Sequence, residues 1–282
     1  MTKAVRFLCL SLAIGSALQA CSTQNSLARI SWTRTLDEAK SKAAAGNRLI
    51  IVDMYADWCG WCKKMDAETW ADPQVIQQQS KYVFLRLNAE KEPDGIALRK
   101  QFSITGFPTI MLLNSDGSEF DRLEGFLPAR QFLEGLSGVV SDSDSLGNLK
   151  LAEIHDRQNL VLRSKLARKL FQKSYYAEAR ARFEEIVDED ADNKSGLKPN
   201  ALFYLALCQA SQRQWDRALS TIDQLRGQYP SSEKIAEASL LSGEILLNLG
   251  RPDEARTRIQ EFLKNYPKHR LASQARRMLA DL

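Results

Sequence analysis

The sequence predicts an α/β domain followed by an all-α domain built from helical repeats. Up to about residue 140, short apolar runs typical of buried strands alternate with amphipathic stretches typical of helices. Beyond residue 150 no strand pattern remains, and segments of similar composition recur. The polar stretch "SDSDSLGN" separates the two patterns and indicates a linker at 141–149. A chain of 282 residues has room for about two domains.

The α/β domain is expected at 34–140 and begins with a helix and a buried strand. "TLDE" is a capping box, and the alanine-rich run after it predicts a helix. The run at 48–55, "RLIIVDMY", is almost entirely apolar and indicates a strand buried on both faces, with Asp53 inside it. The stretch "CGWCKKMDAETW" that follows predicts another helix.

The second half of this domain predicts one more strand and helix, then a hairpin. "YVFLRLN" at 82–88 is the next strand, and a helix is expected over 94–102. "SDG" lies between two strand-like runs, which is typical of a β-hairpin. An amphipathic stretch from Pro128 predicts the closing helix. This order implies a partly parallel sheet covered on both faces, to which the hairpin adds an antiparallel pair.

The C-terminal domain is expected at 150–282 and contains a threefold repeat. Ala179, Ala218 and Ala255 occupy the same place in three similar segments, which are spaced by 39 and 37 residues. The spacing is slightly longer than the 34 residues of a tetratricopeptide repeat, which the segments resemble. The resemblance implies stacked helix pairs that hold a protein partner, closed by a capping helix at 270–282.

The N-terminus carries the pattern of an export signal, expected at 1–20. Two basic residues precede a short apolar run at 7–18. The motif "LQAC" ends at Cys21 and resembles the lipobox of bacterial lipoproteins; a plain secretory signal is the alternative. The resemblance implies a lipid anchor on Cys21 and a tether at 21–33. It also implies a periplasmic location on a bacterial membrane, and the serine after the cysteine favours the outer membrane.

The composition argues against nucleic-acid binding and against a membrane-spanning helix in the mature chain. With 39 basic and 35 acidic residues the net charge is +4, so no electrostatic footprint for nucleic acid is present. No segment of the mature chain is apolar for long enough to predict a membrane-spanning helix.

The chemistry is expected at Cys59 and Cys62, within "YADWCGWCKK". A zinc site needs four ligands, but the α/β domain has no histidine and no second cysteine pair, so no metal is expected. A structural crosslink across so short a loop would restrain little of the unfolded chain. A helix that starts at Cys59 would instead favour its thiolate, since free N–H groups and the helix dipole stabilise negative charge. These considerations favour a redox pair.

Residues 30–140 resemble a thioredoxin-fold domain. "VDMYADWCGWCKK", "RLNAE", "TGFPTIMLL" and a later glycine occur in the order typical of the family. The cysteine segment is most similar to the C-terminal domain of the transmembrane thiol–disulfide interchange reductases. The resemblance implies that Cys59 is the attacking thiol, that Cys62 is the resolving thiol, and that the two form a disulfide.

The same resemblance assigns roles around the pair. Asp53 matches a buried carboxylate beneath the cysteines, and burial without a partner would raise its pKa and suit it to accept the proton of the resolving thiol. Pro108 matches the cis-proline that faces the pair. Trp58, Trp61 and Phe107 are expected to line the substrate groove, with Phe107 in place of the smaller β-branched residue of many relatives.

These observations predict an extracytoplasmic thiol–disulfide oxidoreductase whose repeats dock a protein partner. It is expected to reduce or exchange disulfides of envelope proteins, without a bound cofactor, and to take electrons from a dithiol protein such as a membrane reductase. Trp61, where strong oxidants of the family carry histidine, favours a reductant. The sequence leaves one alternative open, an envelope assembly scaffold that acts through its repeats and contains a non-catalytic thioredoxin fold.

Overall fold

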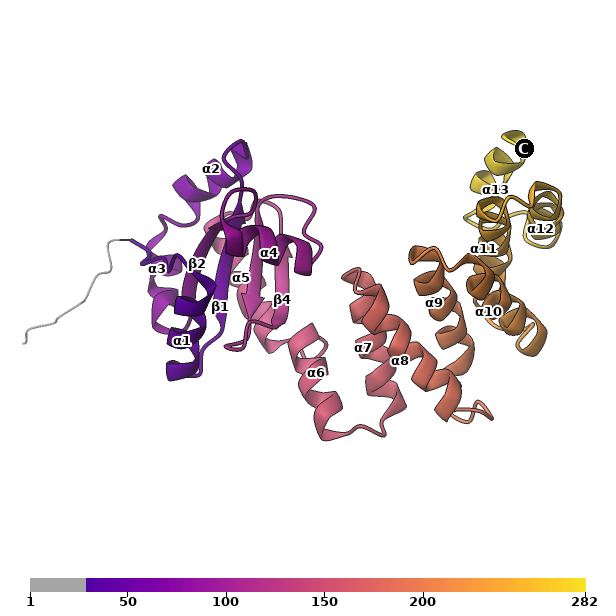
Figure 1. Ribbon diagram of the computed structural model, residues 1–282, viewed down its shortest axis with the longest axis horizontal. Coiled ribbons are helices and arrows are strands. Elements are labelled where there is room, and N and C mark those ends of the chain that lie inside the picture. Colours follow the sequence, from indigo (N-terminus) through magenta and orange to yellow (C-terminus); the bar gives the residue numbers. More distant parts are fainter. Residues whose placement is uncertain (1–28) are drawn as a thin grey trace, which may run out of the picture.

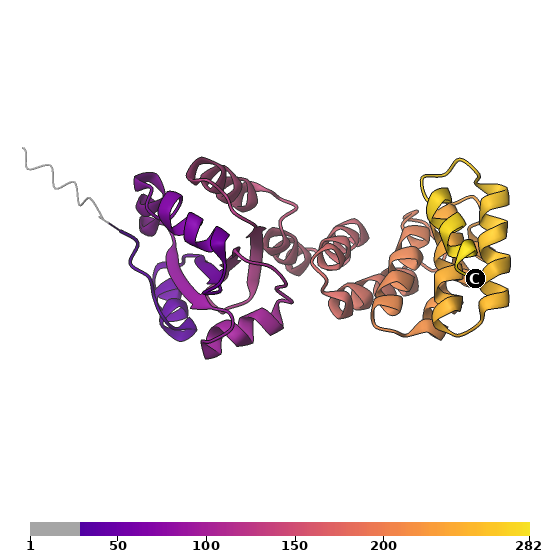
Figure 2. The same ribbon diagram turned by 90° about the horizontal axis from the view of Figure 1, so that it is seen from above.

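The computed structural model describes residues 29–282, and these residues form an α/β domain and a helical array that lie end to end (Figures 1 and 2). The expected export signal and the lipidation site at Cys21 lie outside the described residues, as does most of the expected tether. Within the described residues, no helix combines the length and apolar character needed to cross a membrane. The predicted fold class, α/β followed by all-α, is confirmed.

The α/β domain is built on a mixed sheet with strand order β2-β1-β3-β4. β1 and β2 are parallel, whereas β3 is antiparallel to both β1 and β4. The predicted hairpin is therefore present at one edge of the sheet. The strands are β1 Ile50–Tyr55, β2 Val83–Asn88, β3 Thr109–Leu113 and β4 Glu119–Glu124.

Helices cover both faces of this sheet. Alternate residues of β1 point to opposite faces, so Ile50 and Ile51 belong to different apolar clusters. One cluster packs under α1 and α4, and the other under α2, α3 and α5. Asp53 shares the face of Ile51, beneath α2. The helices are α1 Leu36–Gly46, α2 Gly60–Glu68, α3 Pro73–Gln77, α4 Pro93–Gln101 and α5 Ala129–Ser141, with a short 3-10 helix η1 at Gln78–Ser80.

The array consists of one leading helix, three helix pairs and a terminal helix within the described residues. Ala179, Ala218 and Ala255 are fully buried at the contacts between neighbouring helices. Their small side chains let these helices approach closely. The residues that align in the three sequence repeats therefore occupy equivalent positions in the core of the helical array. The helices are α6 Leu146–His155, α7 Leu160–Gln172, α8 Tyr176–Glu189, α9 Lys198–Ser211, α10 Trp215–Gln228, α11 Ile235–Asn248, α12 Pro252–Asn265 and α13 Ala272–Ala280.

The linker predicted at 141–149 differs in the structure. α5 continues to Ser141 and α6 begins at Leu146, so only four residues connect the helices. Leu146 is fully buried, and Gly147 lies so close to the Phe120 ring of β4 that a Cβ atom there would overlap it. Much of the expected linker is therefore a packed helix, because its apolar residues are covered by β4.

Polar contacts reinforce this junction. The main-chain N–H of Leu146 donates to Asp121 at 3.2 Å, and Lys173 of α7 pairs with the same carboxylate. Arg122 makes a bidentate ion pair with Glu119, at 2.7 and 2.9 Å, and the Tyr175 hydroxyl also contacts both. Buried charges are tolerated when paired in this way. The repeats are therefore docked on the α/β domain through β4.

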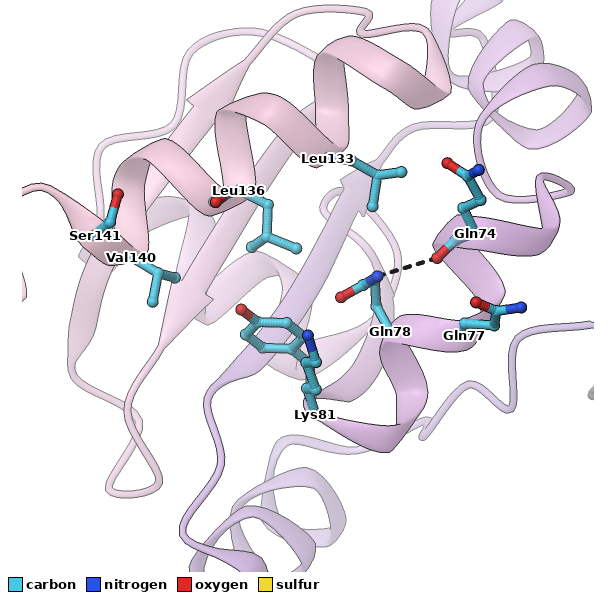
Figure 3. Close-up of a pocket in the computed structure, with 10 residues that line it drawn as sticks. Gln74, Gln77, Gln78, Lys81, Leu133, Leu136, Val140 and Ser141 are labelled. Atoms are coloured by element: carbon cyan, nitrogen blue, oxygen red, sulfur yellow. Dashed lines mark hydrogen bonds between the residues drawn. The ribbon is translucent and has the colours of Figure 1, made fainter.

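A separate hollow of about 540 Å³ lies between α3 and α5 (Figure 3). Leu133, Leu136 and Val140 of α5 face three glutamines from α3 and η1, and the Gln78 side chain donates to the Gln74 carbonyl at 3.1 Å. The lining shares no residue with the cysteine pair or its surroundings described below, so the chemistry of the pair does not involve this hollow.

Candidate redox site

The cysteine pair lies where β1 delivers the chain to α2. Cys59 is the N-cap residue of α2, and its sulfur accepts the N–H of Cys62 at 3.0 Å. The two cysteines form a disulfide with their Cα atoms 5.3 Å apart, and each is only 3% exposed. A sulfur held at a helix N-terminus is favoured as a thiolate once the disulfide is reduced, since the helix dipole and the free N–H groups stabilise its charge.

The loop before β3 closes over the pair. Phe107 and Tyr55 pack against the small buried cluster that contains both cysteines. The peptide bond between Phe107 and Pro108 is cis, and Pro108 is buried. Its carbonyl accepts the N–H of Gly125 at 2.9 Å, where a φ of +83° favours glycine. The ends of β3 and β4 are thereby joined beside the disulfide.

Trp58 belongs to one aromatic wall of the site. It is 69% exposed, lies edge-on to Phe107 with ring centroids 6.0 Å apart, and donates its indole N–H to Glu90 at 2.8 Å. Arg99 of α4 also bonds Glu90, at 3.1 Å, and lies over the Phe107 ring. Phe107 thus fills the space beside the pair and is itself held by a cation.

Trp61 belongs to the opposite wall. It is 58% exposed and stacks on Phe126 with ring centroids 5.6 Å apart, while the Lys64 ammonium lies over both rings. Sequence reasoning missed Phe126, although its place directly after Gly125 was a usable signal. Flat exposed rings on both sides of the buried disulfide can hold the chain of a protein substrate.

Asp53 lies on the face of the sheet covered by α2, the helix that begins directly after Cys59, and it has a partner. The Arg86 guanidinium, opposite it on β2, lies 3.2 Å away and also makes a bidentate pair with Asp66 of α2, at 2.7 and 2.9 Å. The expectation that this carboxyl is unpartnered is therefore wrong. Arg86 is the charged residue within the strand predicted at 82–88, so a possible partner was visible in the sequence. Which residue of that strand lies opposite Asp53 depends on the strand register, which the sequence does not reveal.

Burial nevertheless has the largest effect on the pKa of Asp53. The side chain is removed from water, which raises its pKa from 3.8 to about 7, and the charge of Arg86 opposes that rise only in part. One of its carboxylate oxygens has no hydrogen-bond partner. A carboxyl with this pKa can accept and release a proton near neutral pH, as a group that serves a thiol must.

Other cysteine and metal chemistry finds no support in residues 29–282. This part of the chain contains no group of three or more His, Cys, Asp or Glu side chains arranged to hold a metal ion. Cys208 is buried in α9, and burial raises the pKa of its thiol to about 12. It is therefore a poor nucleophile at neutral pH.

Known proteins resemble the two parts of the chain separately. Residues 36–139 match the family model of the thioredoxin-like domain, and 172–262 match the model of anaphase-promoting complex, cyclosome, subunit 3. The thiol:disulfide interchange protein DsbD of Haemophilus ducreyi is 39% identical over 103 residues, which cover 36% of this chain and 18% of DsbD. DsbD of Pseudoalteromonas atlantica is 34% identical over 124 residues, 42% of this chain and 21% of the relative.

Among solved structures, the oxidised C-terminal domain of Neisseria meningitidis DsbD is 32% identical. The match covers 36% of this chain and 87% of that domain, with a TM-score of 0.30. The chain spans only 18% and 21% of the two full-length relatives, so the likeness concerns one domain. Residues 36–139 form a thioredoxin-like domain, similar to DsbD thiol:disulfide interchange proteins and carrying a Cys-X-X-Cys pair, which is followed by an all-helical region with tetratricopeptide-like repeats.

Proposed function

We propose that this protein is a thiol–disulfide oxidoreductase that reduces or exchanges disulfides of envelope proteins. The position of the Cys59 sulfur carries the proposal, because it sits at the N-terminus of α2 and accepts the N–H of Cys62 at 3.0 Å. That environment stabilises a nucleophilic thiolate. The similarity of residues 36–139 to DsbD supports the same chemistry.

The reduced pair acts in two steps that together transfer two electrons. The Cys59 thiolate attacks one sulfur of the client disulfide, forms a mixed disulfide, and displaces the other client sulfur as a thiolate. Cys62 then gives its proton to Asp53 and attacks the Cys59 sulfur. A disulfide forms between the two cysteines and the client leaves with both sulfurs reduced. A dithiol protein donor returns two electrons to the pair.

The surroundings of the pair favour the reducing direction. The residue before Cys62 is Trp61, whose ring stacks on Phe126 and offers no charge to the Cys59 sulfur. A histidine in that place would stabilise the reduced thiolate and make the pair oxidising. No histidine occurs in the α/β domain.

The cellular setting follows from the N-terminal sequence. The export pattern and the lipobox-like motif ending at Cys21 support a lipid anchor on the periplasmic face of a bacterial membrane, with the outer membrane favoured. The donor is then a dithiol protein of that compartment, such as a membrane reductase. The helical repeats hold a protein partner, as stacked helix pairs commonly do.

Insulin reduction tests the activity. The purified protein should accelerate reduction of insulin by dithiothreitol, and Cys59→Ser should abolish that acceleration because the nucleophile is lost. Reduced Cys62→Ala should instead accumulate a mixed disulfide with insulin, visible on a non-reducing gel, because no thiol resolves it.

Cys208→Ala is the matched control, since it removes a thiol that is buried outside the site, and it should react like the unaltered protein. The proposal fails if the Cys59–Cys62 pair cannot be cycled between dithiol and disulfide at any potential between about −300 and −100 mV. The chain would then act as a scaffold through its repeats.

A further inference from the structure

Two surface clefts meet at the loop that precedes the cis-proline. The first, of about 500 Å³, lies between α4 and this loop, and the second, of about 780 Å³, lies between this loop, the end of β4 and the α7–α8 turn. Ser103 and Thr105 line both clefts. The two clefts therefore adjoin at this loop, and together we call them the junction furrow. In Figure 1 the end of α4 lies on the side of the α/β domain nearest to α7.

One end of the junction furrow begins at the redox site. Glu90 lines it and is the acceptor of the Trp58 indole N–H, and Arg99 lines it and lies over the Phe107 ring. Ile96 lines the same end and is 49% exposed, which is unusual for a large apolar side chain in the described structure. A chain bound here would leave the furrow beside the aromatic wall of the cysteine pair.

The other end belongs to the helical repeats. Lys169, Lys173 and Ser174, from α7 and the turn after it, line the furrow opposite β4. The pairing of Lys173 with Asp121 and the contact of Tyr175 with Glu119 hold this turn against the α/β domain. The two ends of the furrow therefore keep a fixed separation, and one extended peptide segment can contact both.

The lining carries an excess of positive charge. Five cations line the furrow against two carboxylates, and the two buried carboxylates of β4 behind it leave a net charge of about +1. Lys100 makes no ion pair within the described residues, and Lys169 approaches Asp121 only to 3.9 Å while Lys173 bonds that carboxylate. These two ammonium groups are available to a ligand. The cations are Arg99, Lys100, Arg122, Lys169 and Lys173.

We propose that the junction furrow binds an extended acidic segment of the client, next in sequence to the client cysteine that Cys59 attacks. The furrow leads to the redox site, it touches both domains, and its loosely paired charges are cationic on balance, with Lys100 and Lys169 against Glu124. This inference rests on the proposed oxidoreductase function and adds a class of substrate to it. The α7–α8 turn of the repeats would then recognise the same client chain that the cysteine pair reduces.

Peptides of about ten residues with a single cysteine test the proposal. The cysteine is supplied as a mixed disulfide with 5-thio-2-nitrobenzoate, and glutamates lie on its N-terminal or its C-terminal side; matched peptides carry glutamine instead. The reduced Cys59 thiolate attacks the peptide sulfur and expels the coloured thionitrobenzoate, whose release gives the rate. Each rate is divided by the rate of the same protein with the small mixed disulfide of cysteine and thionitrobenzoate.

The full-length protein is compared with the double variant Lys100→Glu/Lys169→Glu. The matched control is Lys81→Glu/Lys264→Glu, which makes the same charge change on the same two domains but outside the furrow, with Lys81 at the hollow of Figure 3 and Lys264 on α12. One acidic peptide should react about fivefold faster than its glutamine counterpart, the size expected for two exposed ion pairs. The preference should disappear in the furrow variant, persist in the control variant, and shrink at about 0.5 M salt.

Two results would overturn the inference while leaving the oxidoreductase function in place. In one, the small disulfide is reduced but both acidic peptides react at the rate of their glutamine counterparts. In the other, the control variant loses the preference as completely as the furrow variant, which would assign it to overall charge. If the small disulfide is not reduced at all, the proposed function itself is refuted, and this inference with it.

Discussion

Asp53→Asn should stabilise the protein by an amount that grows as the pH rises, and the structure sets the size of the effect. The pKa of the buried Asp53 carboxyl is raised from 3.8 to about 7, mainly because it is removed from water. Between these values the folded protein holds a proton that the unfolded chain has lost. The free energy of unfolding therefore falls as pH increases through this window.

The raised pKa can be converted into a free energy. Each tenfold change in proton affinity corresponds to about 1.4 kcal/mol, so a rise from 3.8 to about 7 lowers stability by about 4 kcal/mol above pH 7. Asparagine has nearly the same shape and does not ionise. Arg86 keeps its bidentate pair with Asp66, at 2.7 and 2.9 Å, so the substitution leaves no cation without a partner.

Urea unfolding of the oxidised protein between pH 4 and pH 8 measures the difference. The disulfide removes both cysteine thiols from the titration. Three of the five tryptophans lie in the α/β domain and Trp32 packs against its core, so fluorescence follows that domain. The stability gain of Asp53→Asn over the unaltered protein should grow by about 3–4 kcal/mol across this range. A constant offset between the two curves would reflect altered packing and does not enter the comparison.

Asp66→Asn is the control, because it removes the other carboxylate bound to Arg86 from a side chain that is 40% exposed. That variant should keep the fall in stability with pH. Parallel curves for Asp53→Asn and the unaltered protein would refute the reasoning, since the carboxyl would then have the same pKa in the folded and unfolded states. Asp53→Asn should also slow insulin reduction near pH 7, if this carboxyl takes the proton of the resolving thiol.

Two further predictions concern the junction and the anchor. Gly147→Ala should lower the free energy of unfolding by about 1–3 kcal/mol, because the added methyl overlaps the Phe120 ring. The control Gly138→Ala, whose added methyl meets open space, should raise the free energy of unfolding by up to about 1 kcal/mol. Equal effects of the two substitutions in urea unfolding would contradict the packing of α6 on β4. Cys21→Ser should give a form that is released from washed membranes or that keeps its signal uncleaved, because no thiol remains to carry lipid. Unchanged membrane fractionation of a cleaved form would exclude lipidation at Cys21.

The elements that could be predicted from the sequence are those specified by neighbouring residues. The Thr35 side chain accepts the N–H of Glu38 at 3.2 Å, as the capping box implies. The repeats were visible because each helix pair places a small residue at the same point of the core, as Ala179 does. The cysteine pair was visible because its spacing, its preceding strand and its helix are continuous in the chain.

What could not be predicted depends on residues far apart in the sequence. Leu146 and Gly147 lie in a stretch rich in serine and aspartate, and their burial depends on Phe120 and Asp121 of β4. The partner of Asp53 is set by the register between β1 and β2, which places Arg86 opposite it. In both cases a local pattern indicated a polar or unpartnered residue, and tertiary contacts decided otherwise.

The packed junction changes how the repeats can contribute to catalysis. On a flexible linker, a bound client would reach Cys59 at an effective concentration set by linker length, so any client held by the repeats would gain. In the structure α6 is packed on β4, and the α7–α8 turn is fixed beside the loop that leads to Pro108. Only a client whose docking segment and disulfide match that fixed separation gains from binding both. The repeats should therefore act mainly on which disulfides are reduced, and much less on how fast an unselected disulfide such as that of insulin is reduced.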